Sequence, residues 1–93
     1  MPRLGDSEIE QALAGLKNWR REGDELVREF VLRDFVASLG LITQIGALAE
    51  RANHHPTIAN TYNRVRIGLS THDEGGITER DVALARAIEE RAG

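Results

Sequence analysis

The chain has 93 residues, with 41% hydrophobic and 29% charged side chains, which predicts one ordered globular domain spanning residues 1–93 and argues against disorder. It contains no cysteine, which excludes disulfides and thiolate zinc sites, and its formal net charge of −3 argues against nucleic acid as the main partner. No apolar run approaches the ~20 residues of a membrane span, and residues 1–5 lack the apolar core of a signal peptide, so we expect no membrane contact and a cytoplasmic location.

The first predicted element is a short helix. Residues 1–6 are expected to form a frayed start. Ser7 and Glu10 then form a capping-box pattern, in which the Ser7 hydroxyl accepts hydrogen bonds from first-turn amides and the Glu10 carboxylate reaches back. Apolar side chains recur at helical spacing after this pattern, and Gly15 is expected to end the helix.

A β-hairpin is predicted next, because two extended runs, residues 17–22 and 25–32, flank a Gly-Asp turn. Trp19 in the first run is expected to pack against the core, as large aromatic side chains usually do. In the second run, Val27 and Val31 lie on the opposite face from the other apolar side chains. Both faces of this strand are therefore partly apolar, and we expect the chain to bury the second face by forming a homo-oligomer.

The longest predicted helix and a second hairpin follow. Asp34 is a natural N-cap, a helical stripe of apolar residues continues to about Ala52, and Asn53 is suited to ending the helix. Beyond a proline, residues 57–62 and 64–70 predict two further strands, and the second of these alternates cleanly between apolar and polar side chains.

A second capping box predicts the start of the last helix. Thr78 is followed three residues later by Asp81, whose carboxylate can reach back to the helix start. An apolar stripe then continues at Val82, Ala85 and Ile88. The element order is therefore α-β-β-α-β-β-α, which predicts an α+β fold: a four-stranded antiparallel sheet with three helices packed on one face and a partly apolar open face.

All three histidines fall in two short stretches, His-His-Pro at 54–56 and Ser-Thr-His-Asp at 70–73. The pair is expected just past a helix end, because a residue before proline disfavours helical geometry. Three interpretations are open: each imidazole could satisfy local hydrogen bonds, the three could bind a metal ion, or they could transfer protons without a metal. Adjacent histidines diverge in an extended chain, and no His-x-His or His-x-x-x-His spacing occurs, so a metal site is disfavoured. Acid/base chemistry needs only two or three imidazoles around one cavity, and we favour it.

The residues around the histidines resemble those of the pterin-4a-carbinolamine dehydratases. The resemblance rests on Glu-Arg-Ala-Asn-His-His-Pro at 50–56, Tyr-Asn at 62–63 and Ser-Thr-His-Asp at 70–73. It extends over nearly the whole chain, through Gly76, Thr78 and Asp81 downstream and Trp19, Phe30, Asp34 and Phe35 upstream. One departure follows the His-His-Pro, where the family commonly has an acidic residue and Trp and this chain has Thr57 and Ile58. The family's preference for a pterin side chain is therefore not carried over.

The resemblance implies a fold and a function. The fold is the same four-stranded antiparallel sheet with three helices, and the reaction is dehydration of 4a-hydroxytetrahydropterin to quinonoid dihydropterin. This reaction recycles the cofactor of aromatic amino-acid hydroxylases, which suggests a functional link to such an enzyme. The resemblance further implies a homodimer or homotetramer, and we expect neither cofactor nor metal. Some animal members also act as dimerisation cofactors for a homeodomain transcription factor. The alternative is a non-catalytic protein-binding module that uses the open sheet face.

The resemblance also implies roles for individual residues. His54, His55 and His72 are expected to be catalytic, without a decision on which is the acid and which the base. Loss of water from a carbinolamine needs an acid for the departing oxygen and a base for the N5 proton. Glu50 is equally well explained as a solvated helix charge, and Asp81 as a helix-capping residue. The residues expected to bind substrate are Glu50, Asn53, Pro56, Ser70, Thr71 and Asp81.

Overall fold

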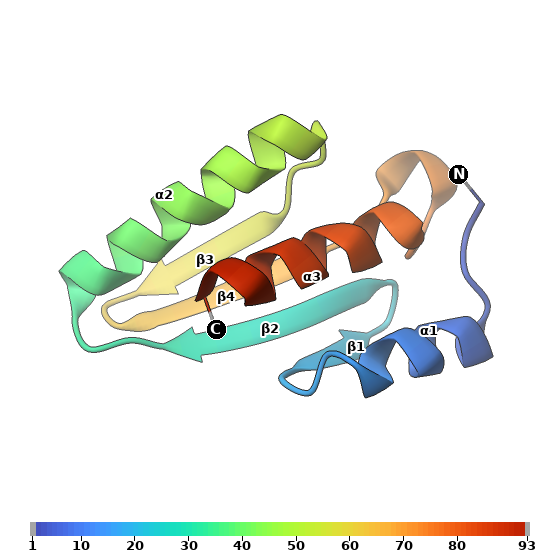
Figure 1. Cartoon of the computed structure of the whole chain (residues 1–93), viewed down its shortest axis with the longest axis horizontal. Coiled ribbons are helices and arrows are strands. Elements are labelled where there is room, and N and C mark those ends of the chain that lie inside the picture. Colours follow the sequence, from blue (N-terminus) through green and yellow to red (C-terminus); the bar gives the residue numbers. More distant parts are fainter. Residues whose placement is uncertain (1, 93) are drawn as a thin grey trace.

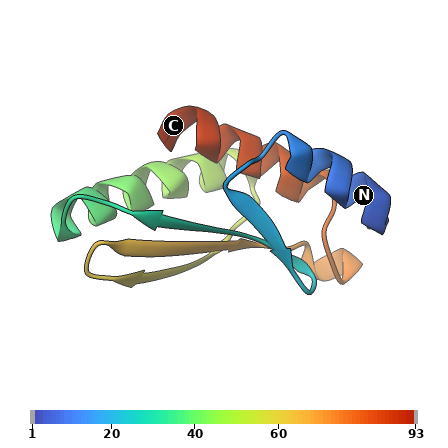
Figure 2. The ribbon, with the colours of Figure 1, turned by 90° about the horizontal axis from the view of Figure 1, so that it is seen from below.

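Three helices cover one face of a four-stranded antiparallel sheet in the computed structural model, which describes residues 2–92 (Figure 1). Figure 2 shows the helices together on one side of the sheet, with the other face open. The predicted fold class and element order are confirmed, with one short 3-10 helix, η1, in addition. The two ends of the predicted 1–93 domain, residues 1 and 93, lie outside the described residues. The elements are α1 (Asp6–Ala14), β1 (Trp19–Glu22), β2 (Glu25–Val31), α2 (Phe35–Ala52), β3 (Thr57–Thr61), β4 (Arg64–Leu69), η1 (His72–Glu74) and α3 (Glu79–Ala92).

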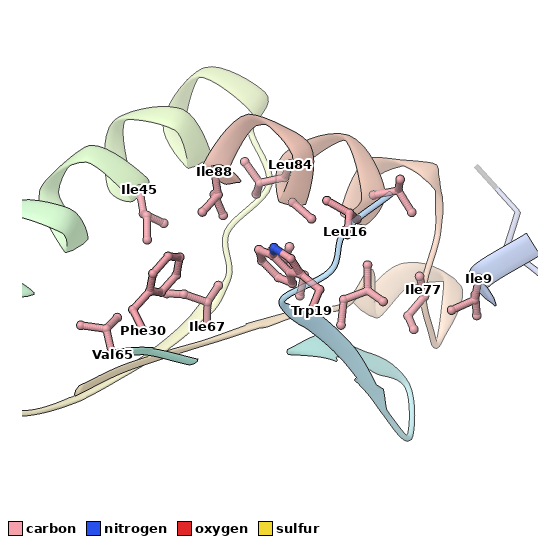
Figure 3. Close-up of a cluster of buried hydrophobic side chains, with 14 residues drawn as sticks. Ile9, Leu16, Trp19, Phe30, Ile45, Val65, Ile67, Ile77, Leu84 and Ile88 are labelled. Carbon is pink, nitrogen blue, oxygen red and sulfur yellow. The ribbon is translucent and has the colours of Figure 1, made fainter. Parts of the chain in front are cut away.

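The two hairpins join through β2 and β4, which gives the strand order β1-β2-β4-β3. In this pairing Phe30 lies opposite Val65, and Leu26 lies opposite Leu69. Because side chains alternate across a strand, these apolar residues all point to the helix-covered face. The prediction that Trp19 belongs to the core is confirmed. Figure 3 shows the strand residues packed with apolar side chains of the helices and connecting segments, among them Ile9, Leu16, Ile45, Ile77, Leu84 and Ile88.

Helix α2 begins and ends where the sequence predicts. Asp34 Oδ1 accepts a hydrogen bond from the Ala37 N–H at 2.8 Å, which is the predicted N-cap contact. Asn53 adopts the left-handed conformation (φ 50°), and its N–H donates to the carbonyl oxygens of Ala49 and Glu50. Asparagine is one of the few residues that tolerates this conformation, because its short polar side chain can bond locally. The chain therefore leaves the helix at Asn53, directly before the histidine pair.

The predicted Ser7 cap and the predicted frayed start are both wrong. Gly5 precedes helix α1, and its backbone N–H donates to Glu8 Oε1 at 2.8 Å. The Leu4 N–H donates to the Ile77 carbonyl oxygen at 2.8 Å, and the Leu4 side chain packs against the core. This tertiary contact orders the start of the chain, and α1 begins at Asp6, upstream of Ser7, with Glu8 rather than Glu10 as the carboxylate that reaches back.

The open face of the sheet is more polar than the sequence predicted. Val27 points to this face but is fully buried, opposite Arg20 on β1. Arg20 forms ion pairs with Glu22 at 2.7 Å and Glu29 at 2.6 Å, and Arg66 pairs with Glu22 at 2.6 Å. The hydrogen bond from Arg20 holds the pKa of the Glu22 carboxyl below its ordinary value. The long stems of these charged side chains can cover Val27 while their charges stay in water.

Large exposed apolar side chains gather where β2 ends, α2 begins and β3 turns into β4, and one of them, Val31, points to the open face near Ala59. We call this group the α2 patch. It consists of Val31, Phe35, Val36, Leu39 and Tyr62, and Val36 is its most exposed member, at 74%. A backbone hydrogen bond from the Leu32 N–H to the Asn63 carbonyl oxygen joins the end of β2 to the turn between β3 and β4.

Among residues 2–92, no helix is long and apolar enough to cross a bilayer.

Candidate functional site

A cavity of about 250 Å³ lies where α2 ends, β4 ends and α3 begins. The first residues of β3 and the last residues of β4 lie at the same end of the sheet, because the two strands run antiparallel. The turn after α2 thus lies beside the turn after β4, at the end of the molecule where α3 starts (Figure 1). This brings all three histidines to one cavity, which is lined by Asn53, His54, His55, Ser70, Thr71, His72, Asp73 and Arg80.

His54 is bonded to a buried hydrogen-bond network centred on Asp81. Its Nε2 lies 2.5 Å from Oδ1 of Asp81, a residue with no exposed surface. The other Asp81 oxygen, Oδ2, accepts from the Thr71 hydroxyl and from the Thr78 N–H, both at 2.8 Å. The Thr71 and Thr78 hydroxyls are also 2.8 Å apart. The predicted reach of Asp81 back to the start of α3 is confirmed by the Thr78 contact, and the same carboxyl group also orients an imidazole.

The other two histidines are in different surroundings. The His55 side chain is 57% exposed, and its Nε2 bonds to the carboxylate of Glu50, which is itself 78% exposed. His72 is exposed as the first residue of η1. One imidazole of the cavity is therefore buried and oriented by protein, and the other two are in contact with water.

The structure brings most of the predicted site residues together but separates three of them. Glu50 lies on the exposed end of α2 and contacts His55, while Pro56 and Asp81 do not line the cavity. Asp81 lies behind His54 and Thr71, so it faces the protein rather than the cavity. The predicted residues that line the cavity are Asn53, His54, His55, Ser70, Thr71 and His72.

Arg80 and Asp73 also line the cavity, although neither is among the predicted site residues. Arg80 Nη2 donates to the Asn53 carbonyl oxygen at 2.6 Å, so it links the first turn of α3 to the end of α2. A basic side chain in the first turn of a helix opposes the helix dipole. That mismatch is the signal that could have identified Arg80 from the sequence. Asp73 follows His72 directly and offers no separate signal.

The chemistry available in the cavity is proton transfer. Within residues 2–92, no three histidine, aspartate or glutamate side chains come close enough to hold a metal ion. Three imidazoles can both donate and accept protons, and neutral imidazole has one donor and one acceptor nitrogen. The contact with Asp81 decides which edge of His54 is turned toward the protein, and so which edge is left for a ligand.

Comparisons with known proteins agree on one family. A sequence model of the family described as pterin 4 alpha carbinolamine dehydratase matches residues 2–91. A protein of Chloroflexus aurantiacus that carries the provisional name pterin-4-alpha-carbinolamine dehydratase is 50% identical over 93 residues, covering 100% of both chains. A protein of Metallosphaera sedula with the same provisional name is 48% identical over 90 residues, covering 97% of this chain and 94% of its own.

Two solved structures are similar in fold. The crystal structure of a transcriptional coactivator/pterin dehydratase from Brucella melitensis superposes with a TM-score of 0.93 at 39% identity, covering 98% of this chain and 99% of that chain. A pterin dehydratase-like protein, identified as a RuBisCO assembly factor in the alpha-carboxysome, superposes with a TM-score of 0.69 at 25% identity, covering 82% and 90%.

Proposed function

The chain belongs to the pterin 4 alpha carbinolamine dehydratase family, and from this membership we propose that it converts 4a-hydroxytetrahydropterin to quinonoid dihydropterin and water. The proposed catalysis is metal-free proton transfer by histidines, in the cytoplasm, in support of an aromatic amino-acid hydroxylase. The observation that carries the proposal is the cavity with three imidazoles, one of which is oriented by the buried carboxyl group of Asp81.

His54 is the proposed base. A carboxylate can only accept hydrogen bonds, so with Asp81 in that form His54 donates through Nε2. Neutral His54 then has its unprotonated Nδ1 available to accept a proton. In the reaction, the N5–H electrons form the C4a=N5 bond while the N5 proton moves to this nitrogen. Asp81, Thr71 and Thr78 act through His54, as positioning residues.

His72 is the proposed acid. Hydroxide is a poor leaving group, so the C4a–O bond breaks readily only if the oxygen is protonated as it leaves as water. His72 lines the cavity and is exposed, so it can regain its proton from solvent. His55, held by Glu50, is proposed to orient the substrate. Asn53 and Ser70 are proposed to hydrogen-bond the pterin ring, while Pro56 shapes the turn that presents the histidines.

The purified chain should make 4a-hydroxytetrahydropterin disappear faster than it does without enzyme. Ultraviolet absorbance measures the rate. Because the proposed steps involve only imidazole protons, we expect the same rate after exhaustive chelation. Arg86→Gln, at an exposed position on the side of α3 toward α1, serves as a control that should keep full activity. No acceleration over background would contradict the dehydratase proposal. Loss on chelation with recovery on added zinc would contradict the metal-free mechanism.

We also propose that the chain assembles as a homodimer or homotetramer through the α2 patch. Exposed apolar patches on soluble domains commonly mark protein–protein contacts. Sedimentation should show a species larger than the monomer at micromolar concentration. Val36→Glu, which places a charge on the most exposed member of the patch, should shift it toward monomer, whereas Thr57→Glu, on the open sheet face away from Val31, should not. A wild-type monomer would contradict the assembly.

The second candidate function is a non-catalytic protein-binding module on the open sheet face. It is supported by the coactivator and assembly-factor names of the two solved relatives. The ion-paired open face of this chain offers less apolar surface for such a partner than the α2 patch does. If Thr57→Glu, and not Val36→Glu, disrupts assembly, the open face is the contact surface and this second candidate gains support.

A further inference from the structure

A second cavity, of about 340 Å³, adjoins the first and lies between α2 and α3. His54 and Arg80 line both cavities, so these two side chains form the wall between them. We call the second one the interhelix cavity. Its lining contains no carboxylate and is mostly aliphatic: Leu48, Arg51, Ala52, His54, Arg80, Ala83, Leu84 and Ala87.

The interhelix cavity carries two guanidinium groups, those of Arg51 and Arg80, that have no anionic partner among residues 2–92. Neither group forms an ion pair there, and the Arg80 guanidinium donates only to the Asn53 carbonyl oxygen. By contrast, Arg20 and Arg28 are bonded to carboxylates, whereas Arg64 and Arg91 resemble Arg51 and Arg80 in forming no ion pair within residues 2–92. Guanidinium groups bind carboxylates and phosphates through paired, charge-assisted hydrogen bonds. A ligand that fits this cavity therefore combines an apolar portion with an anionic group.

The first cavity is small for a substituted pterin. Sites for small molecules usually measure roughly 300–1,000 Å³, and the histidine-lined cavity alone lies below that range at about 250 Å³. Its polar lining suits the flat, hydrogen-bonding pterin ring. A substituent on C6 of that ring extends beyond the histidine-lined cavity. The interhelix cavity lies next to it, on the other side of His54 and Arg80.

We propose that the interhelix cavity binds the C6 substituent of the pterin substrate, and that the preferred substituent ends in a carboxylate or phosphate. This inference rests on the proposed dehydratase function. It defines a substrate class, reduced pterins with an anionic C6 substituent, over pterins with a neutral hydroxyalkyl chain. Arg51 is the specificity-determining residue, since it lines the interhelix cavity but not the histidine-lined one.

Equilibrium binding of stable 7,8-dihydropterins tests the inference without turnover. Dihydroneopterin and its monophosphate form a matched pair that differs only in the anionic group, and dihydrofolate supplies the carboxylate arm on an aryl spacer. We expect the wild type to bind an anionic compound about tenfold more tightly than dihydroneopterin, as one charge-assisted contact allows. Whichever of dihydroneopterin monophosphate and dihydrofolate binds more tightly identifies whether the cavity is suited to phosphate or to carboxylate.

Two variants test the role of the interhelix cavity in binding. Arg51→Gln should remove most of this preference while leaving the affinity for dihydroneopterin unchanged. Ala83→Leu, at an exposed helix position, should fill the cavity and weaken binding of C6-substituted compounds but not of unsubstituted 7,8-dihydropterin. Arg86→Gln removes the same charge from the side of α3 toward α1, away from both cavities, and should leave the preference intact, which controls for long-range electrostatics. No preference in the wild type, or an Arg51→Gln variant that weakens neutral and anionic compounds equally, would overturn the inference.

Turnover of the neutral carbinolamine distinguishes failure of the inference from failure of the proposed function. Turnover without any preference for an anionic C6 group refutes the inference and leaves the dehydratase proposal standing. Preferential binding that depends on Arg51, without turnover, supports the inference and refutes the dehydratase proposal. Absence of binding by every dihydropterin refutes both.

Discussion

Replacing His54 by alanine is expected to lower the turnover number by about 10²–10⁴-fold, the usual contribution of a general acid or base. The reason is that His54 is the imidazole whose orientation the protein fixes, through Asp81, with one edge left to accept the N5 proton. His54→Gln can still donate an amide N–H to the carboxyl group, but it cannot transfer a proton. The glutamine variant should therefore bind substrate far better than it turns it over. Steady-state kinetics with background subtraction provides the measurement.

The other two histidines serve as the internal comparison for that experiment. His72→Ala should also lower turnover strongly, because His72 is the proposed acid. His55→Ala should lower turnover less and affinity more, since His55 is exposed and bonded to Glu50 rather than to the buried network. Circular dichroism checks that each variant folds. If folded variants at both His54 and His72 keep near-wild-type turnover, the imidazoles have no role in proton transfer.

Replacing Asp81 by asparagine is expected to lower turnover about as much as the loss of His54, by about 10²–10⁴-fold, although Asp81 does not line the cavity. An asparagine side chain has one acceptor oxygen and one NH₂ donor group. If the oxygen keeps the contacts with Thr71 and Thr78, the NH₂ group faces Nε2 of His54. That nitrogen must then accept, so the proton moves to Nδ1 and His54 presents a donor where the reaction needs an acceptor.

Asp81→Ala should have its main effect on stability. It leaves the His54 ring, the Thr71 hydroxyl and the Thr78 N–H buried without their acceptor. Leaving a buried neutral donor without its acceptor typically costs about 1–3 kcal/mol in free energy of unfolding, a large share of the stability of a domain this small. Urea denaturation measures the change.

A control separates the Asp81 network from the helix dipole. Glu79→Gln removes an exposed negative charge from the same first turn of α3 without touching the network, so it should change stability by only a few tenths of a kcal/mol. An Asp81→Asn variant with wild-type turnover would show that the carboxyl group is only a helix cap. A stable Asp81→Ala variant would show that the buried donors find other partners.

Much of the fold could be predicted from the sequence because its signals act over a few residues. The alternation of Val65, Ile67 and Leu69 with polar neighbours predicts a strand with one buried face, since side chains in a strand point alternately to opposite faces. Asp34 and Asn53 mark the two ends of α2, because each satisfies backbone groups within one helical turn. The gathering of the histidines near helix and strand ends was predictable for the same reason.

The rest depends on contacts between residues far apart in the chain. The order of the chain start depends on Leu4 reaching Ile77, and Val27 is buried opposite Arg20 on the neighbouring strand. Local patterns contain no information about such partners.

The site shows the same division between local and long-range contacts. The residue types and spacing by themselves indicate three imidazoles near one helix end. Only the tertiary structure decides that Asp81, 27 residues from His54, contacts its ring, and that Arg80 reaches the end of α2. The physical reason is that hydrogen bonds within one turn are set by chain geometry, whereas these contacts form only when packing of α3 against the sheet brings the two segments together.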